Sequence, residues 1–252
     1  MLIGNSSLIY YLKADTMSLT LKALVFAVVA AAAAPVLAGP IQLITNGSFE
    51  TGTLTGWTMN GTGYADNKFY AAKNGANAPV SAYATQTNAN GGTWYALSDQ
   101  TGAGGETLSQ SFTKTGNMSS LILSFDWFNT VHTSYSGTTI DGSGEAGRID
   151  IMSAVAATYD VGSGVVKNLE LNAGSTTTTM AWQHVSFDLS SLAAGTYSLR
   201  FATGQCCSYQ EMGVDNVSLV ANVPEPASLM LGLAGFAALA WQRRRNGKNQ
   251  KV

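Results

Sequence analysis

From Ile41 onward, the chain of 252 residues predicts an all-β fold built as a two-sheet antiparallel sandwich. Apolar and polar residues alternate with a period of two in short runs, which gives each run one apolar face and indicates a strand. Clusters of Gly, Asn and Ser, which favour turns, separate these runs. Between Gly39 and Asn222, no apolar pattern of helical period extends beyond a turn or two. These three observations favour one all-β domain over residues 39–222.

The strands follow from the alternation, taken along the chain. It is clearest in five runs, residues 121–128, 148–152, 184–189, 197–201 and 214–219. Five less regular runs are also predicted to be strands, namely 42–45, 56–59, 80–85, 93–98 and 107–112. We expect loops where the alternation stops, at 64–78, 100–105, 131–147 and 202–212. Roughly nine to eleven strands in about 180 residues fit the two packed layers of a sandwich.

Composition and charge narrow the function classes. Charged residues make up 11% of the chain and aromatic residues 10%, and there are 27 glycines. This balance is common in exported β proteins and differs from the high charge of disordered chains. Between Gly39 and Asn222, six Lys and Arg stand against thirteen Asp and Glu, a formal charge of −7. An acidic domain repels the phosphate backbone, so we expect no nucleic-acid partner.

The first 38 residues predict a secretory signal peptide. Residues 1–16 show no pattern, whereas Met17 opens a segment with a positive residue, Lys22, an apolar run over 23–34, and small residues up to Ala38. This order is that of a signal peptide cleaved after Ala38. We expect translation to start at Met17. The alternative for the apolar run is a membrane helix.

The C-terminal segment has three parts in order. Val223-Pro224-Glu225-Pro226 stops the last strand, because proline fixes φ and lacks a backbone donor. An uncharged apolar run reaches Trp241, Arg243-Arg244-Arg245 follows, and a polar tail covers 246–252. About fifteen residues make roughly 22 Å of helix, against a hydrocarbon core of about 30 Å. The segment therefore predicts a short transmembrane helix that spans the bilayer marginally, with the arginines in the cytoplasm.

This order of a Pro-Glu-Pro motif, a short apolar helix and a basic end resembles the PEP-CTERM sorting signal of Gram-negative bacteria, over residues 223–245. The resemblance implies that exosortase, a membrane transpeptidase-like enzyme, recognises Glu225 and the two prolines. It also implies cleavage near the motif, a transient stay in the inner membrane, and delivery to the cell surface or the exopolysaccharide matrix. An ordinary C-terminal membrane anchor is the alternative.

Two stretches at the ends of the central domain form a second pattern. The first is Asn46-Gly47-Ser48-Phe49-Glu50-Thr51-Gly52, and the second is Gly213-Val214-Asp215-Asn216-Val217-Ser218-Leu219. With the strand runs between them, they resemble the galactose-binding-like jelly rolls, which include many carbohydrate-binding modules. The resemblance covers residues 41–221 and implies a jelly-roll sandwich, flanked here by the signal helix and the short transmembrane helix.

The same resemblance implies a structural calcium ion. In that superfamily an early Glu and a late Asp often bind calcium together with backbone carbonyls. The matching residues are Glu50 and Asp215, with Asn46 and Gly52 as further candidates. Calcium takes roughly six to eight oxygen ligands, which carboxylates and loop carbonyls supply. The alternative is that Glu50 and Asp215 only accept hydrogen bonds from loop amides.

Candidates for sugar binding and catalysis are few. Most aromatic residues fall in contexts that predict the core, which leaves Tyr135 and Tyr209, on expected loops, as candidates for an exposed sugar-stacking face. His132 lies in an expected loop and His184 in a strand, where it faces solvent, and no nucleophile motif accompanies either. The glycine pattern at 142–147 precedes a strand and not a helix, so it does not predict a phosphate site.

Cys206 and Cys207 are the two cysteines of the chain, and they adjoin each other. In an oxidising compartment they could form a vicinal disulfide or pair between molecules. Otherwise they are two thiols in a loop with no catalytic role.

Together these patterns predict an exported, non-catalytic protein of the cell surface or exopolysaccharide matrix. A carbohydrate-binding, lectin-like module is the alternative, and a hydrolase is a third hypothesis. Exosortase is the expected processing partner, and exopolysaccharide is a candidate ligand.

Overall fold

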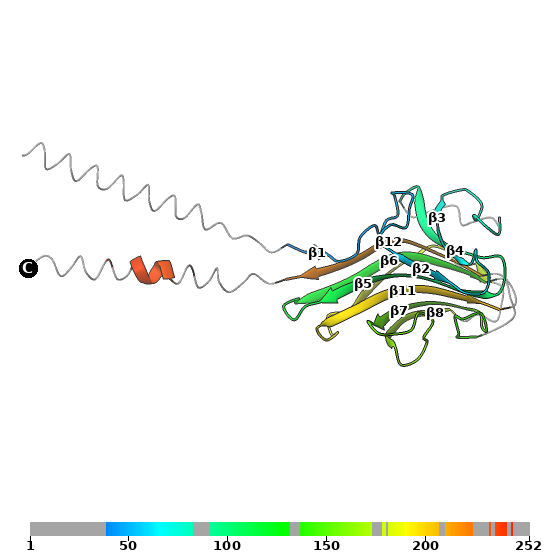
Figure 1. The fold of residues 1–252 in the computed structure, drawn as a ribbon. Coiled ribbons are helices and arrows are strands. Elements are labelled where there is room, and N and C mark those ends of the chain that lie inside the picture. Colours follow the sequence, from blue (N-terminus) through cyan, green and yellow to red (C-terminus); the bar gives the residue numbers. More distant parts are fainter. Residues whose placement is uncertain are drawn as a thin grey trace, which may run out of the picture. The chain divides into compact units, whose positions relative to one another are not determined.

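The computed structural model describes most of the central domain and parts of the C-terminal segment. Described are residues 39–82, 91–131, 137–172, 178–179, 181–206 and 210–223, together with 232, 235–240 and 243. Residues Gly39–Pro224 form one compact unit (Figure 1). The predicted signal peptide over 1–38 and the polar tail over 246–252 lie outside the described residues.

Two antiparallel sheets make up this unit, which confirms the predicted all-β, two-sheet arrangement. The seven-stranded sheet has the order β10 (Gln183–Asp188), β6 (Ser120–Val131), β12 (Gln210–Asn222), β4 (Trp94–Asp99) and β3 (Lys68–Lys73), with β1 (Ile41–Gln42) on β12 and β9 (Thr178–Thr179) on β6. The five-stranded sheet has the order β2 (Thr58–Gly61), β5 (Gly104–Lys114), β11 (Gly195–Gln205), β7 (Ala146–Ser153) and β8 (Val165–Asn172). All strand pairs among the described residues are antiparallel.

Apolar side chains from both sheets meet in one core, so the two sheets pack face to face (Figure 1). In β6, every second residue from Leu121 to Trp127 belongs to this core, as the period of a strand requires. From the opposite sheet, the ring of Phe201 lies 5.2 Å from that of Phe125 and 6.0 Å from that of Trp57, measured between centroids. Apolar side chains are thus buried between the two sheets, as the alternating sequence predicted.

The seven-stranded sheet is also covered on its outer face. Tyr95 and Leu97 of β4, and Phe128 of β6, form a second buried cluster there. Trp182 packs across it, with its ring 4.8 Å from Phe128 and 5.4 Å from Tyr95 and nearly perpendicular to both. β4 is therefore buried on both faces, which a strand facing solvent on one side would not be.

Most predicted strands are present. The five runs with the clearest alternation fall in β6, β7, β10, β11 and β12, and the runs at 93–98 and 107–112 fall in β4 and β5. The run at 42–45 forms a strand only over Ile41–Gln42, and the run at 56–59 is displaced to Thr58–Gly61. The predicted strand boundaries therefore differ from the observed ones by a few residues, whereas the strands with one apolar face were predicted correctly.

Three sequence predictions about strands and loops were wrong. The expected loop at 64–78 contains β3, and most of the described part of the expected loop at 202–212 belongs to the ends of β11 and β12. Residues 80–82 form no strand, and 83–85 lie outside the described residues. β8 was not predicted, because its pairing with β7 has two register shifts that interrupt the alternation of its side chains. β3 buries Phe69 on one face and Ala72 on the other, so it too lacks a clean period of two.

The C-terminal segment has helical residues over 235–240 and at Arg243. No helix among the described residues is both long enough and apolar enough to cross a membrane. The predicted transmembrane run is described only in part, so its span stays a prediction.

Candidate functional site

The β-bulge in β12 brings the two motifs of the domain ends together. The register of β12 against β6 shifts between Asp215 and Ser218, and Asn216 there has a φ of 50°. The N–H of Val217 donates to the carbonyl of Gly47 at 2.9 Å. A Cβ atom at Gly47 would lie 1.9 Å from the Val217 carbonyl oxygen, so the close approach requires glycine. The segment that follows β1 is thus fixed against the last strand.

Asp215 is a buried carboxylate at this junction, with 1% of its surface exposed. Its Oδ1 accepts a hydrogen bond from the N–H of Asn216 at 2.7 Å. Burial raises the pKa of Asp215 to about 7; that hydrogen bond opposes the rise, and the charges of Asp126 and Glu50 add to it. The position is therefore electronegative, and a positive charge there would be stabilising.

Glu50 is held against the beginning of β4. Its Oε1 accepts hydrogen bonds from the N–H groups of Thr93 at 2.9 Å and Trp94 at 3.0 Å. A Cβ atom at Gly92 would lie 2.0 Å from this oxygen, so the glycine leaves room for the carboxylate. Glu50 and Asp215 thus both accept backbone hydrogen bonds, Glu50 at the beginning of β4 and Asp215 from the next residue of β12. Each acts through only one oxygen in these bonds, and the two charges still act on each other.

Asn46 and Gly52 shape the loop between these groups. The Asn46 side chain donates to the carbonyls of Thr53 and Thr55 at 2.8 Å and 3.0 Å, and its Oδ1 accepts from the Thr51 hydroxyl at 3.1 Å. Gly52 has a φ of 68°, which glycine adopts without strain. Among the residues that the structure describes, no group of three His, Cys, Asp or Glu is arranged to hold a metal ion. A calcium ion here would therefore depend on Glu50, Asp215 and uncharged oxygens.

A polar row that sequence reasoning missed runs beside Asp215. The register places His184 of β10 opposite Asp126 of β6, and Asp126 opposite Asp215 of β12. Asp126 Oδ1 lies 2.7 Å from His184 Nδ1, and Asp126 Oδ2 accepts from the Asn216 side chain at 2.8 Å. The His184 side chain is 62% exposed, as predicted. Nothing in the sequence pairs these residues, since β10 and β12 are neighbours of β6 only in the folded sheet.

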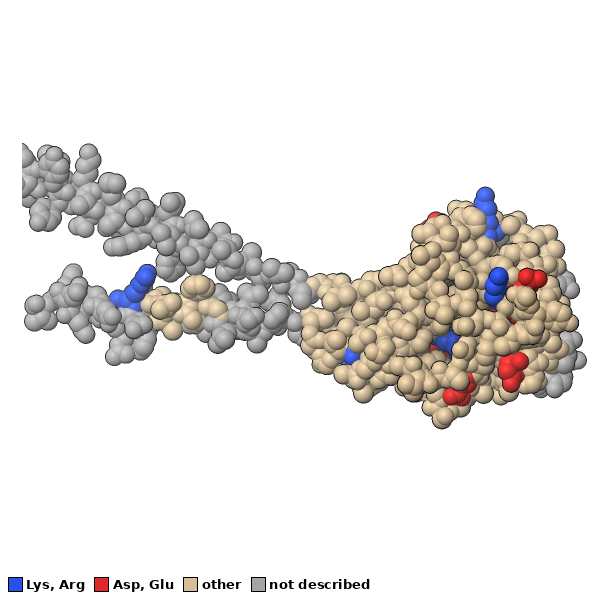
Figure 2. All heavy atoms as spheres, viewed as in Figure 1, with Lys and Arg blue, Asp and Glu red and all other residues tan. Residues whose placement is uncertain are grey.

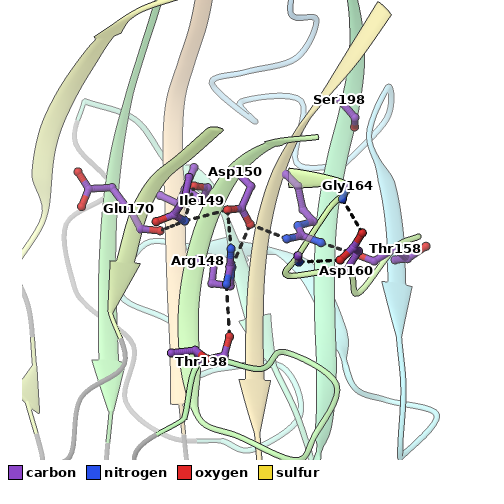
Figure 3. A network of polar contacts seen from close by, with 12 residues as sticks. Thr138, Arg148, Ile149, Asp150, Thr158, Asp160, Gly164, Glu170 and Ser198 are labelled. Atoms are coloured by element: carbon purple, nitrogen blue, oxygen red, sulfur yellow. Dashed lines mark hydrogen bonds and ion pairs between the residues drawn. The ribbon is translucent and has the colours of Figure 1, made fainter. Parts of the chain in front are cut away.

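A buried ion network lies on the outer face of the five-stranded sheet (Figure 3). Arg148 of β7 binds Asp150 through two parallel hydrogen bonds of 3.0 Å and 3.1 Å. Arg200 of β11 binds the same carboxylate through Nη2, and Asn168 of β8 donates to it at 2.8 Å. Asp150 is fully buried, and both arginines are at most 5% exposed. Burial lowers the pKa of Arg200, while its hydrogen bond and ion pair with Asp150 oppose this shift.

The network also holds two loops on the sheet. Arg200 donates to the carbonyl of Thr158 at 2.8 Å, and Arg148 to that of Thr138 at 3.4 Å. Asp160, in the first of these loops, accepts from the N–H groups of Gly162 and Gly164 at 2.6 Å and 2.7 Å. The Arg148-x-Asp150 spacing could have indicated the pair, because residues two apart share a face of a strand. Arg200 could be added only from the strand order.

Several sequence candidates fall outside the site or outside the described residues. Tyr135, Tyr209 and His132 lie outside the described residues. Cys206 takes part in a disulfide bond, which agrees with one of the alternatives for the cysteines. The glycine pattern at 142–147 leads directly into β7, so no helix follows it, as expected.

Comparison with known proteins identifies the C-terminal segment. Residues 222–245 match the family model described as the PEP-CTERM protein-sorting motif. The segment is a PEP-CTERM sorting motif. Val223 and Arg243 of this motif are among the described residues, whereas Pro224, Glu225, Pro226, Arg244 and Arg245 are not. No curated protein matches the chain that carries it.

Solved structures resemble the domain ahead of the PEP-CTERM motif. TmCBM61, solved in complex with β-1,4-galactotriose, is 15% identical to this chain, with a TM-score of 0.42. The match covers 71% of this chain and 97% of the TmCBM61 chain. The K3 cleaved adhesin domain of Lys-gingipain from Porphyromonas gingivalis W83 is 15% identical, with coverages of 72% and 99% and a TM-score of 0.45. A cyclase from Fischerella sp. TAU is 15% identical, with coverages of 75% and 100% and a TM-score of 0.46. Similarity at this level does not extend to a ligand or an activity.

Replacing Asp150 by Asn is expected to destabilise the domain by about 3 to 5 kcal/mol, because two buried guanidinium groups would lose their counter-charge. Urea denaturation followed by tryptophan fluorescence measures the change in unfolding free energy. Asp66→Asn, at an exposed acid, is the matched control and should shift it by less than about 0.5 kcal/mol. An Asp150→Asn chain as stable as this control would contradict the assigned role of the network.

Proposed function

We propose that this chain is an exported, non-catalytic protein that is delivered through its PEP-CTERM motif to the cell surface or exopolysaccharide matrix of a Gram-negative bacterium. The match at residues 222–245 carries the proposal. The motif implies processing by exosortase during a transient stay in the inner membrane. The jelly-roll domain over residues 39–222 is the passenger that reaches the surface.

The distribution of charge in the domain suits contact with an uncharged polysaccharide. Figure 2 shows few Lys, Arg, Asp or Glu side chains on the visible face of the domain. Ten charged residues are instead buried, namely Asp99, Glu106, Lys114, Asp126, Glu145, Arg148, Asp150, Arg200, Glu211 and Asp215. The remaining surface is rich in Ser, Thr, Asn and Gly, whose polar groups can hydrogen-bond sugar hydroxyls.

Glu225→Ala is expected to block processing, because it removes the charged residue between the two prolines of the motif. The unprocessed chain should then accumulate in the membrane fraction and retain Arg243. Fractionation followed by mass spectrometry of C-terminal peptides measures this. Lys248→Ala, in the tail beyond the matched residues, is the control and should be processed normally. Wild-type protein that still carries Arg243 at the cell surface would contradict the proposal.

A structural calcium ion is part of the proposed function. Glu50 and Asp215 would hold it, with carbonyl oxygens of the 46–52 loop completing the ligand set. The charge of Glu50 acts on the buried Asp215, and the pKa of Asp215 is raised, which is the electrostatic setting that a divalent cation relieves. Bound calcium would supply the positive charge that fixes the first motif of the domain to the last strand.

Calcium is expected to raise the melting temperature of the full-length chain by about 5 to 10 °C at a hundredfold excess over its dissociation constant. Asp215→Asn should remove most of this rise, since it replaces a charged ligand by a neutral one. Differential scanning fluorimetry with matched ionic strength measures both. Asp66→Asn, at an exposed acid away from the loop, should keep the full rise. A shift no larger than magnesium or sodium produces would exclude the site.

The alternative function is carbohydrate binding at the loops that contain Tyr135 and Tyr209. One observation favours it. Val131 lies opposite Gln210, and Gly204 lies opposite Ala146, so the β6–β7 and β11–β12 connections begin and end at the same end of the sandwich. Two aromatic residues on such neighbouring connections could stack on one sugar.

Under this alternative, the full-length chain binds a defined glycan on an array, and Tyr209→Ala weakens that binding by roughly threefold to tenfold, the loss expected for one stacking contact. Tyr135→Ala should have a similar effect. Ile41→Ala serves as the control, because Ile41 is an exposed apolar residue that pairs with Ala221, at the opposite end of β12 from Gln210. Binding to no glycan would leave the structural role ahead.

A further inference from the structure

One end of the space between the sheets is polar, in contrast to the apolar core. We call it the polar interior end and define it by Glu106, Asn129, Gly147, Thr203, Gln205 and Gln210. Each lies an even number of positions from a core residue on its own strand. Glu106 is two positions before Leu108, Asn129 two positions after Trp127, and Gln210 two positions before Met212. Because strand side chains alternate with a period of two, these side chains point between the sheets.

Sheet register brings these residues to one place. Thr203 lies opposite Glu106 on β5 and opposite Gly147 on β7, and its hydroxyl donates to Glu106 Oε2. From the other sheet, Gln210 donates to Asn129 Oδ1 at 3.1 Å. A Cβ atom at Gly147 would lie 2.6 Å from Asn129 Oδ1 and 3.1 Å from Gln210 Nε2. The side-chain amides of Asn129 and Gln210, in the seven-stranded sheet, therefore contact the backbone of the five-stranded sheet at Gly147. Gly147 lies opposite Thr203, the residue that binds Glu106.

Buried oxygens in this region have no hydrogen-bond partner. Glu106 Oε1, Gln205 Oε1 and Gln210 Oε1 are all buried and unpartnered, and so is Oε1 of Gln100, whose side chain donates to the Gln210 carbonyl at 2.6 Å. Glu106 and Gln210 are fully buried, and Gln205 is 8% exposed. An unpaired buried acceptor costs about 1 to 3 kcal/mol, so several together indicate an occupant.

The electrostatics of the region favour a positive occupant. Glu106 is fully buried; its Oε2 accepts from the Thr203 hydroxyl, and its Oε1 has no hydrogen-bond partner. Among the described residues, no Lys or Arg forms an ion pair with Glu106. A second buried carboxyl, Glu145, lies two residues before Gly147 in the chain. Acceptor oxygens are thus concentrated in this region, and Glu106 has no cationic partner among the described residues.

We propose that the polar interior end binds a hard metal cation of the calcium type through Glu106 and the side-chain oxygens of Gln205 and Gln210. Such cations prefer carboxylate and carbonyl oxygens and tolerate irregular geometry. Oε1 of Glu106 and the amide oxygens of Gln205 and Gln210 would be the protein ligands, and water would complete the coordination. This site is separate from Glu50 and Asp215, and it does not depend on the proposed sorting or on the proposed calcium there.

The test uses the full-length chain carrying Asp215→Asn, which removes the first proposed site. This variant should still bind about one Ca²⁺ per chain in calorimetry, and bound Tb³⁺ should luminesce when tryptophan is excited, because Trp127 adjoins the site. Adding Glu106→Gln should weaken binding at least tenfold. Glu170→Gln, at a half-buried acid on β8, is the matched control and should leave binding unchanged.

Two results would overturn the inference. One is an Asp215→Asn chain that binds neither Ca²⁺ nor Tb³⁺, and the other is a Glu106→Gln chain that binds as tightly as the control. Near-UV circular dichroism verifies that the variants are folded. If Glu106→Gln does not fold, Gln210→Leu replaces it, since it removes one oxygen and no charge, and unchanged binding there would equally exclude the site. If only the Glu50 and Asp215 site does not exist, the wild type and Asp215→Asn should bind the same number of Ca²⁺ ions per chain.

Discussion

The pairing of β12 with β6 is the interaction on which the rest of the domain depends. β12 is the longest strand of the described chain and pairs with β6, β4 and β1, so it joins the two ends of the domain sequence within one sheet. Its bulge between Asp215 and Ser218 receives the carbonyl of Gly47 and aligns Asp215 with Asp126 and His184. A bulge of this kind redirects side chains that a regular ladder would space evenly. The junction of the two sequence motifs is thus a consequence of one irregularity in one strand pair.

A second feature of the domain is where its charge lies. Few charged side chains lie on the face of the domain drawn in Figure 2, whereas ten charged residues of the described chain are buried. Buried charge is stable only when it is paired or bound by a cation, because desolvation is costly. Arg148, Asp150 and Arg200 satisfy this requirement among themselves, whereas among the described residues no Lys or Arg forms an ion pair with Glu106 or Asp215. These two carboxylates are the positions proposed to bind cations.

These two features suit the proposed exported passenger. If the proposed sites bind cations, the domain would gain stability outside the cell by mass action, because cations are plentiful there. The PEP-CTERM motif at residues 222–245 is a separate part of the chain with a separate task. Sorting and extracellular stability are in this view independent properties, carried by different segments.

Local pattern was enough to determine part of this protein. The alternating runs around Phe125, Ile149, Phe201 and Val217 predicted inward faces that the core confirms, and the order of prolines, apolar run and arginines predicted the PEP-CTERM motif. Both are properties of residues close together in the chain. β3 and β8 were missed because burial on two faces, or a shifted register, removes the period on which such predictions depend.

Tertiary structure alone decided which distant residues meet. Arg200 joins Arg148 and Asp150, His184 joins Asp126, and Thr203 joins Glu106, in each case across strands whose order the sequence does not encode locally. The physical reason is that hydrogen bonding between strands fixes one register out of many, and this register is selected by burial of the whole core and not by any single segment.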